Sequence, residues 1–212
     1  MAISNAYKRM IKVETKKLTK PIVLKIFTSS NNLQESVKML EVIDIYKKAS
    51  NGLIKTEEYR LETNLNLSKK YNIQKAPAIL LVNTDDQAMI RYLSIPSAAK
   101  IQPFVEALMV STGAPNYYEN VIRENLDKII PSAIKVLITD YCAYCSRIIS
   151  ICSLFTLASD GKLQTNIIDI MTYPEIGEYY DVATVPTLVI NEDNILVGDI
   201  PAEVLLNELI KK

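Results

Sequence analysis

Two of the three cysteines in the chain stand three positions apart, in the stretch TDYCAYCSR at residues 139–147. Cys142 and Cys145 follow the apolar run IKVLI and precede a stretch with helical spacing of apolar residues. Side chains at positions i and i+3 on the first turn of a helix share a face and lie close enough to form a disulfide. Unpaired N–H groups at a helix start also stabilise a thiolate. We therefore predict an exposed nucleophile of lowered pKa at Cys142 and a resolving thiol at Cys145.

A pair of cysteines at this spacing can also supply half of a zinc site, which needs four ligands. The chain contains no histidine and one further cysteine, Cys152. Cys152 stands two turns beyond Cys145 on an apolar helical stretch and is interpreted as a small buried hydrophobic residue. The composition therefore favours a redox pair over a metal site, and no metal ligand is assigned. An iron–sulfur cluster shared between two chains is a minor alternative.

Charge and hydropathy restrict the partners and the compartment. The 24 Lys and Arg residues balance 24 Asp and Glu residues, so no overall field steers the chain onto nucleic acid or an anionic membrane. No window reaches the ~18 to 20 apolar residues needed to cross a bilayer, and the N-terminus lacks the apolar segment of a signal peptide. We expect a cytoplasmic protein that binds neither nucleic acid nor membrane. In a reducing compartment, a close cysteine pair is more often catalytic or metal-binding than structural.

One order of strands and helices occurs twice along the chain. It reads strand, helix, strand, short helix, strand, strand, helix. The expected elements lie at 21–29, 33–49, 52–62, 65–72, 76–83, 88–94 and 98–110, and again at 134–140, 146–158, 161–170, 173–182, 184–191, 194–199 and 201–212. A further helix precedes each copy, at 6–18 and 116–130. Turn residues at 111–116 place a linker near Gly113, which divides the chain into units 1–113 and 114–212.

The connections predict an α/β fold. Within each unit, the helical crossover makes the first two strands parallel neighbours, and the short hairpin makes the last two antiparallel. Each unit is therefore expected to form a four-stranded mixed sheet flanked by helices.

This order of elements carries a family resemblance. The Cys-x-x-Cys at the first strand-to-helix junction of the second unit, and Val185–Pro186 before its third strand, resemble the thioredoxin fold. Two tandem units in a chain of this length resemble the archaeal protein disulfide oxidoreductases, glutaredoxin-like proteins related to protein disulfide isomerase. The resemblance implies dithiol–disulfide exchange on protein disulfides, without a cofactor and with a thioredoxin-reductase-like electron donor. The direction of electron flow, as reductase, oxidase or isomerase, is left open.

The resemblance also implies the residues that contact substrate. A cis bond between Val185 and Pro186 exposes backbone groups that can pair with an extended substrate strand beside Cys142. The implied substrate-binding residues are Tyr141, Ala143, Tyr144, Val185 and Pro186. The glutaredoxin-like pattern usually has proline where Ala143 stands, so this loop is expected to be somewhat freer.

The first unit departs from the family pattern. It keeps the proline, at Pro77, but has Asn31 and Gln34 where thiols would be expected. We predict that it contributes no chemistry and serves as a binding platform. The alternative is that the whole chain is a redox-inactive interaction module or holdase.

The group that transfers protons is not fixed by the sequence. Thioredoxin has a buried acidic residue on the strand before its cysteines, and Val136 stands at the matching position here. Asp140 and Asp169 are the candidates that remain. Asp140 could cap the helix or oppose a thiolate on Cys142, and the sequence does not decide between these effects.

Overall fold

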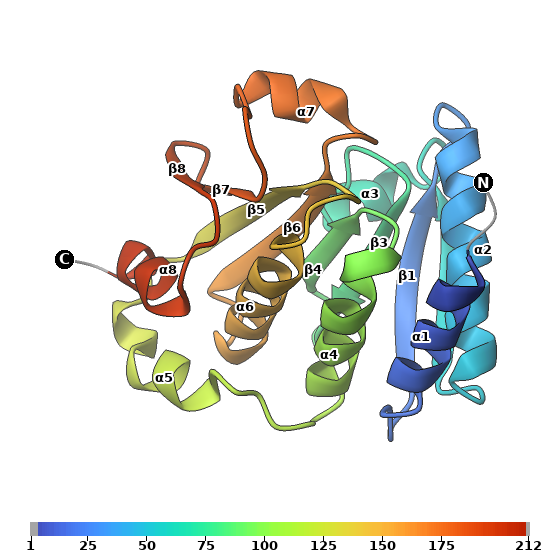
Figure 1. Ribbon diagram of the computed structural model, residues 1–212, viewed down its shortest axis with the longest axis horizontal. Helices are drawn as coiled ribbons and strands as arrows, with labels where there is room; N and C mark the ends of the chain where they lie inside the picture. The colour runs from blue at the N-terminus through green and yellow to red at the C-terminus, as the bar shows by residue number, and fades with distance from the viewer. Residues whose placement is uncertain (1–3, 211–212) are drawn as a thin grey trace.

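Two copies of one strand-and-helix arrangement share a single sheet in the computed structural model, which describes residues 4–210 (Figure 1). The first copy contains α1 (Asn5–Thr15), β1 (Ile22–Thr28), α2 (Leu33–Ala49), β2 (Ile54–Arg60), α3 (Leu65–Lys70), β3 (Ala78–Val82), β4 (Ala88–Leu93), the 3-10 helix η1 (Ala98–Lys100) and α4 (Ile101–Ser111). The second contains α5 (Glu119–Glu124), η2 (Leu126–Lys128), β5 (Ser132–Ile138), α6 (Cys145–Ala158), β6 (Leu163–Asp169), α7 (Pro174–Tyr179), β7 (Thr187–Ile190), β8 (Asn194–Val197) and α8 (Ala202–Leu209).

Strand pairing within each copy follows the predicted pattern. β1 is parallel to β2 and antiparallel to β3, which is antiparallel to β4. In the second copy, β5 is parallel to β6 and antiparallel to β7, which is antiparallel to β8. The predicted α/β class and the tandem mixed sheets flanked by helices are confirmed.

The two half-sheets are joined, which the sequence did not predict. β4 pairs in parallel with β6, from Ile90 opposite Thr165 to Leu93 opposite Ile168. This junction gives an eight-stranded sheet in the order β2-β1-β3-β4-β6-β5-β7-β8 within residues 4–210. The pairing satisfies the backbone groups that β4 and β6 would otherwise expose as edge strands.

Helices cover the two faces of this sheet unequally (Figure 1). α2, α4 and α6 contribute to the larger core, on one face, whereas α3 and α7 pack over the smaller core on the other. Phe104 of α4 meets the rings of Tyr46 and Tyr92 edge-on, with centroids 5.2 and 5.0 Å away. α6 is buried on most of its surface because it lies between the sheet, α4 and α5. The position of α6, which begins at Cys145, is therefore fixed by packing on several sides.

The connection between the copies differs from its prediction. Gly113 follows α4 with a φ of 95°, as glycine commonly does after a helix. The single helix expected at 116–130 is instead the short α5 followed by η2, because the chain turns at Asn125. The expected last helix, 201–212, ends at Leu209 in α8, and residues 211–212 lie outside the described residues. None of the described helices has the length and apolar character to cross a membrane.

Candidate redox site

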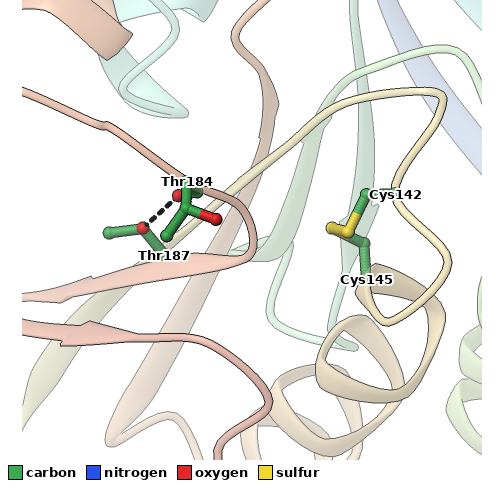
Figure 2. Close-up of a disulfide and its surroundings, with 4 residues drawn as sticks. All are labelled: Cys142, Cys145, Thr184 and Thr187. Carbon is green, nitrogen blue, oxygen red and sulfur yellow. Dashed lines mark hydrogen bonds between the residues drawn. A yellow bond between two sulfur atoms is a disulfide. The ribbon is translucent and has the colours of Figure 1, made fainter.

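A disulfide joins Cys142 to Cys145, with 5.4 Å between their Cα atoms (Figure 2). Cys142 lies in the loop after β5, and Cys145 is the first residue of α6. The side chain of Tyr144, at the N-cap of α6, makes no capping hydrogen bond. Because the S–S bond ties Cys142 to the first helical residue, its sulfur lies at the N-terminus of α6. A thiolate formed there would be stabilised by the helix dipole and the unpaired N–H groups.

Two details predicted for Cys142 are wrong. Its side chain is 8% exposed rather than open to solvent, and it precedes α6 instead of standing on the first turn. The physical reason is a turn in the loop, in which the Cys142 N–H donates to the Thr139 carbonyl over 3.3 Å. This turn packs Cys142 against the larger of the two hydrophobic cores.

Exposed side chains surround the disulfide. Tyr141 is 92% exposed and Tyr144 is 67% exposed, and Ala143 between the cysteines is also exposed. Met171, in the loop after β6 at the same end of the sheet, is 69% exposed. Sequence reasoning missed Met171, although an apolar residue directly after the strand end NIIDI was a signal that could have found it. Tyr141, Ala143 and Tyr144 are thus exposed beside the cysteines in the sequence, and Met171 is exposed at the same end of the sheet.

The turn before β7 faces the disulfide. The Val185–Pro186 peptide bond is cis, the isomer expected from the sequence. The Thr187 hydroxyl donates to the Thr184 carbonyl over 2.7 Å, and Figure 2 shows both sulfur atoms pointing toward this turn. The Pro186 carbonyl accepts from the Gly198 N–H over 2.8 Å.

Val185 is left available for another chain. Among residues 4–210, no hydrogen bond engages the Val185 backbone N–H or carbonyl. An extended segment could therefore pair with these groups beside the disulfide.

A lysine of the first unit reaches the site. Lys100, the last residue of η1, forms ion pairs with Asp140 and, over 3.5 Å, with Asp169. The side chains of Lys100 and Asp169 are 3% and 6% exposed, whereas that of Asp140 is 49% exposed. Sequence reasoning missed Lys100, whose signal was a lysine embedded in the apolar stretch AAKIQPF.

This ion-pair arrangement separates the roles of the two aspartates. Asp140 does not cap α6, and Lys100 compensates the charge that would oppose a thiolate on Cys142. Asp169 ends β6, where its Cα pairs with that of Ile138 at the end of β5. Burial raises the pKa of the Asp169 carboxyl, and the positive charge of Lys100 partly opposes the rise. Asp169 is therefore a buried acidic group that Lys100 links to Asp140 of the cysteine loop.

The equivalent loop of the first unit holds a hydrogen-bond network instead of thiols. Glu62 accepts from the Ser29 hydroxyl over 2.6 Å and from the Ser30 N–H over 2.8 Å. These hydrogen bonds lower the pKa of the Glu62 carboxyl to about 2, and the bond from the Ser29 hydroxyl has the largest effect. Asn31 follows in the same loop, and its N–H donates to the Ser29 hydroxyl. The Ala76–Pro77 bond is also cis, so the first unit keeps the turn without the cysteines.

The third cysteine is placed as predicted. Cys152 is fully buried on α6, and burial raises the pKa of its thiol. Within residues 4–210, no three His, Cys, Asp or Glu side chains gather as a set of metal ligands.

Comparison with known proteins supports the assignment of the fold. Residues 132–211 match the family model described as Thioredoxin domain. No curated protein sequence gives a significant match. The chain is similar in structure to AhpF, a component of the alkylhydroperoxide reductase of Enterococcus faecalis, with a TM-score of 0.84 and 18% identity, covering 99% of this chain and 100% of the other. It is also similar in structure to a protein disulfide oxidoreductase from Aeropyrum pernix, with a TM-score of 0.83 and 19% identity. That match covers 99% of this chain and 93% of the other.

These similarities define a protein of two tandem thioredoxin folds. The predicted resemblance to archaeal protein disulfide oxidoreductases is confirmed for the fold, and the second unit carries the match to the thioredoxin domain. A Cys-x-x-Cys disulfide at the strand-to-helix junction of such a fold supports redox activity.

Proposed function

We propose that the protein is a thiol–disulfide oxidoreductase that acts on protein disulfides through Cys142 and Cys145. The observation that carries the proposal is the Cys142–Cys145 disulfide, which faces a turn where the backbone of Val185 has no partner among the described residues. Exposed Tyr141 and Tyr144 beside the disulfide add a surface for an unfolded or extended substrate. Backbone pairing at Val185, next to the cis Pro186, would hold the substrate sulfur near Cys142.

The reaction follows from the different burial of the two sulfurs. In the reduced protein, the Cys142 thiolate attacks one sulfur of a substrate disulfide, which forms a mixed disulfide and releases one substrate thiolate. The Cys145 thiolate then attacks the Cys142 sulfur, which forms the Cys142–Cys145 disulfide and releases the second substrate thiolate. Two electrons pass from the protein to the substrate, and the structure corresponds to the oxidised product. Each step is reversible, so the same site serves oxidation or isomerisation when the potentials favour them.

Asp169 is the proton acceptor that we assign to this exchange. It is buried at the end of β6, its pKa is raised by burial, and Lys100 holds its carboxylate. A base whose pKa lies closer to neutrality is better matched to a thiol, and it would help to deprotonate Cys145 before the second attack. Asp140 is half exposed to solvent, which makes it the weaker candidate.

The two units divide the work in this proposal. Residues 114–212 perform the exchange, and residues 1–113 act as a non-catalytic platform that binds the substrate, because Asn31 and Gln34 cannot exchange disulfides. A thioredoxin-reductase-like donor in the cytoplasm would return electrons to the Cys142–Cys145 disulfide.

A second candidate is an electron carrier that serves one dedicated partner. The structural similarity to AhpF, a component of an alkylhydroperoxide reductase, over nearly the full length of both chains favours it. Both candidates use the same cysteines. They differ in whether unrelated protein disulfides are reduced at useful rates.

Insulin reduction with dithiothreitol as the electron source tests the proposal. The parent protein should accelerate the turbidity that follows insulin reduction, Cys142→Ser should fall to the uncatalysed rate, and the matched control Cys152→Ser should remain active. If Cys142→Ser reduces insulin as fast as the parent, the enzyme proposal is wrong and an interaction module is favoured. A dedicated electron carrier would show little insulin reduction although its disulfide is readily reduced by dithiothreitol.

A further inference from the structure

A cavity of about 500 Å³ lies between the two units, on the face of the sheet that carries α3 and α7. The first unit contributes Lys75 and Arg91 to its lining, and the second contributes Lys135, Asn166 and Tyr179. The cysteines do not line it. Its volume lies in the range of pockets that hold small molecules.

Arg91 is the unusual group in this cavity. It stands on β4 and is only 5% exposed. Its Nε donates to the Tyr71 carbonyl over 2.7 Å, and its Nη1 donates to Oε1 of Gln164 over 3.0 Å. Both acceptors are neutral. Among the described residues, no carboxylate forms an ion pair with Arg91, and its Nη2 has no hydrogen-bond partner.

The other charges that line the cavity are already paired. Lys75 forms an ion pair with Glu175 over 2.5 Å, and Lys135 forms one with Glu192. Pairing of the two lysines with the two glutamates leaves Arg91 as the uncompensated positive charge. Buried charges in proteins are normally paired, because an isolated buried ion is costly.

We propose that this cavity binds a small organic anion through a carboxylate or phosphate group held by Arg91. A guanidinium presents parallel N–H donors that match the two oxygens of such a group. The free Nη2 supplies one of these donors. Apolar side chains from both units, among them Leu93 and Ile168, line the cavity and would contact the remainder of the ligand.

The binding site has a structural consequence. Because the lining comes from both units, a bound anion would add a link across the β4–β6 junction. Binding to the folded state alone stabilises that state by mass action. This inference does not depend on the redox function, because it involves neither the cysteines nor the turn at Pro186.

Titration with inorganic phosphate and, separately, with succinate tests the inference on the full chain. Ionic strength is held constant with sodium chloride, and the unfolding temperature is measured. At least one probe should raise it in a saturable manner, and the tighter probe identifies the preferred group. Arg91→Gln should weaken binding at least about tenfold, Arg91→Lys should be intermediate because it lacks the fork, and the exposed control Arg123→Gln should bind as the parent does.

If Arg91→Gln does not fold, nuclear magnetic resonance of the parent protein provides a second test. The Nε–H resonance of Arg91 and the amide of Asn166 should shift with the bound fraction of the probe. Absence of a saturable response to both anions, or equal binding by a folded Arg91→Gln, would overturn the inference and leave Arg91 as a clamp between Tyr71 and Gln164. Shifts confined to surface lysines would overturn it as well.

Discussion

The three cysteines of the chain differ in burial and in position relative to α6. Cys142 precedes the helix and is 8% exposed, Cys145 begins it at 1%, and Cys152 is fully buried two turns further on. A substrate sulfur can therefore approach Cys142 more easily than the other two. The helix N-terminus favours a thiolate on the same residue.

Alkylation of the reduced protein should follow this order. At pH 7, iodoacetamide should label Cys142 first and Cys145 much more slowly, because reactivity depends on thiolate fraction and exposure. Cys152 should remain unlabelled until the protein unfolds, since burial raises its pKa. Mass spectrometry of the digested protein at successive times measures the three rates. Equal labelling of Cys142 and Cys152 in the folded protein would contradict the assignment of the nucleophile.

The pH dependence of exchange should report on Asp169. Only its carboxylate form accepts a proton. Burial raises the pKa of the Asp169 carboxyl from its ordinary value, and the positive charge of Lys100 partly opposes the rise. The rate of the parent protein should therefore fall as the pH is lowered through that raised pKa. Asp169→Asn should be slower, on the order of 10²-fold, and should lack this acidic limb.

Asp160→Asn is the control for this profile. Asp160 lies at a surface turn, where its side chain is 57% exposed, and its φ of 50° suits asparagine. Its profile should match that of the parent. An unchanged acidic limb in Asp169→Asn would assign the proton transfer to another group.

At the scale of elements, η1 connects the first unit to the redox site of the second. Its last residue, Lys100, is buried between Asp140 of the cysteine loop and Asp169 of β6. The first unit therefore supplies a charge to the site although its own loop has no thiols. This contact extends the predicted role of the first unit from a binding platform to a part of the electrostatic environment of Cys142.

Replacement of Lys100 by methionine should destabilise the protein. It would leave Asp169 buried without its cationic partner, and removal of one member of a buried ion pair typically costs about 3 to 5 kcal/mol. Urea unfolding at pH 7 measures the change in the free energy of unfolding. Lys128→Met is the matched control, because Lys128 is the last residue of η2 but is exposed. Equal stability of the two variants would show that the buried contact of Lys100 does not stabilise the fold.

The elements were largely predictable because their signals are local. Apolar periodicity and turn residues depend on neighbours in the chain, so β1 and β5 were placed within two residues of their observed ends. The start of α6 was also placed within one residue, but the burial of Cys142 was not predicted, because its packing against the core depends on distant residues. Lys100 and Asp169 are 69 positions apart in the sequence. Their contact therefore could not be predicted from local sequence patterns, although both residues were visible in the sequence.

At the scale of the whole molecule, the continuous sheet makes the two units one structure. The β4–β6 pairing is supported by a hydrogen bond of 2.8 Å from the Tyr173 hydroxyl to the Pro77 carbonyl and by the Lys75–Glu175 ion pair. This junction could not be predicted, because the sequence indicated that β4 and β6 are strands but not that they pair with each other. Only the geometry of the assembled halves brings their edges together.

Unfolding should therefore be a single cooperative transition. Backbone circular dichroism and tyrosine fluorescence should give the same midpoint in urea. Tyr173→Phe should lower the free energy of unfolding by about 1 to 3 kcal/mol, because it leaves the buried Pro77 carbonyl without its donor. Two separate transitions in the parent protein would show that the units fold independently despite the shared sheet.

The central claim is that Cys142 attacks substrate disulfides and Cys145 releases the product. Trapping of the mixed disulfide tests this claim most directly. Reduced Cys145→Ser, mixed with insulin, should accumulate a covalent complex that survives on a non-reducing gel, and mass spectrometry should place the linkage at Cys142. Cys142→Ser should form no such complex. A complex linked through Cys145 or Cys152, or equal trapping by both variants, would contradict the account.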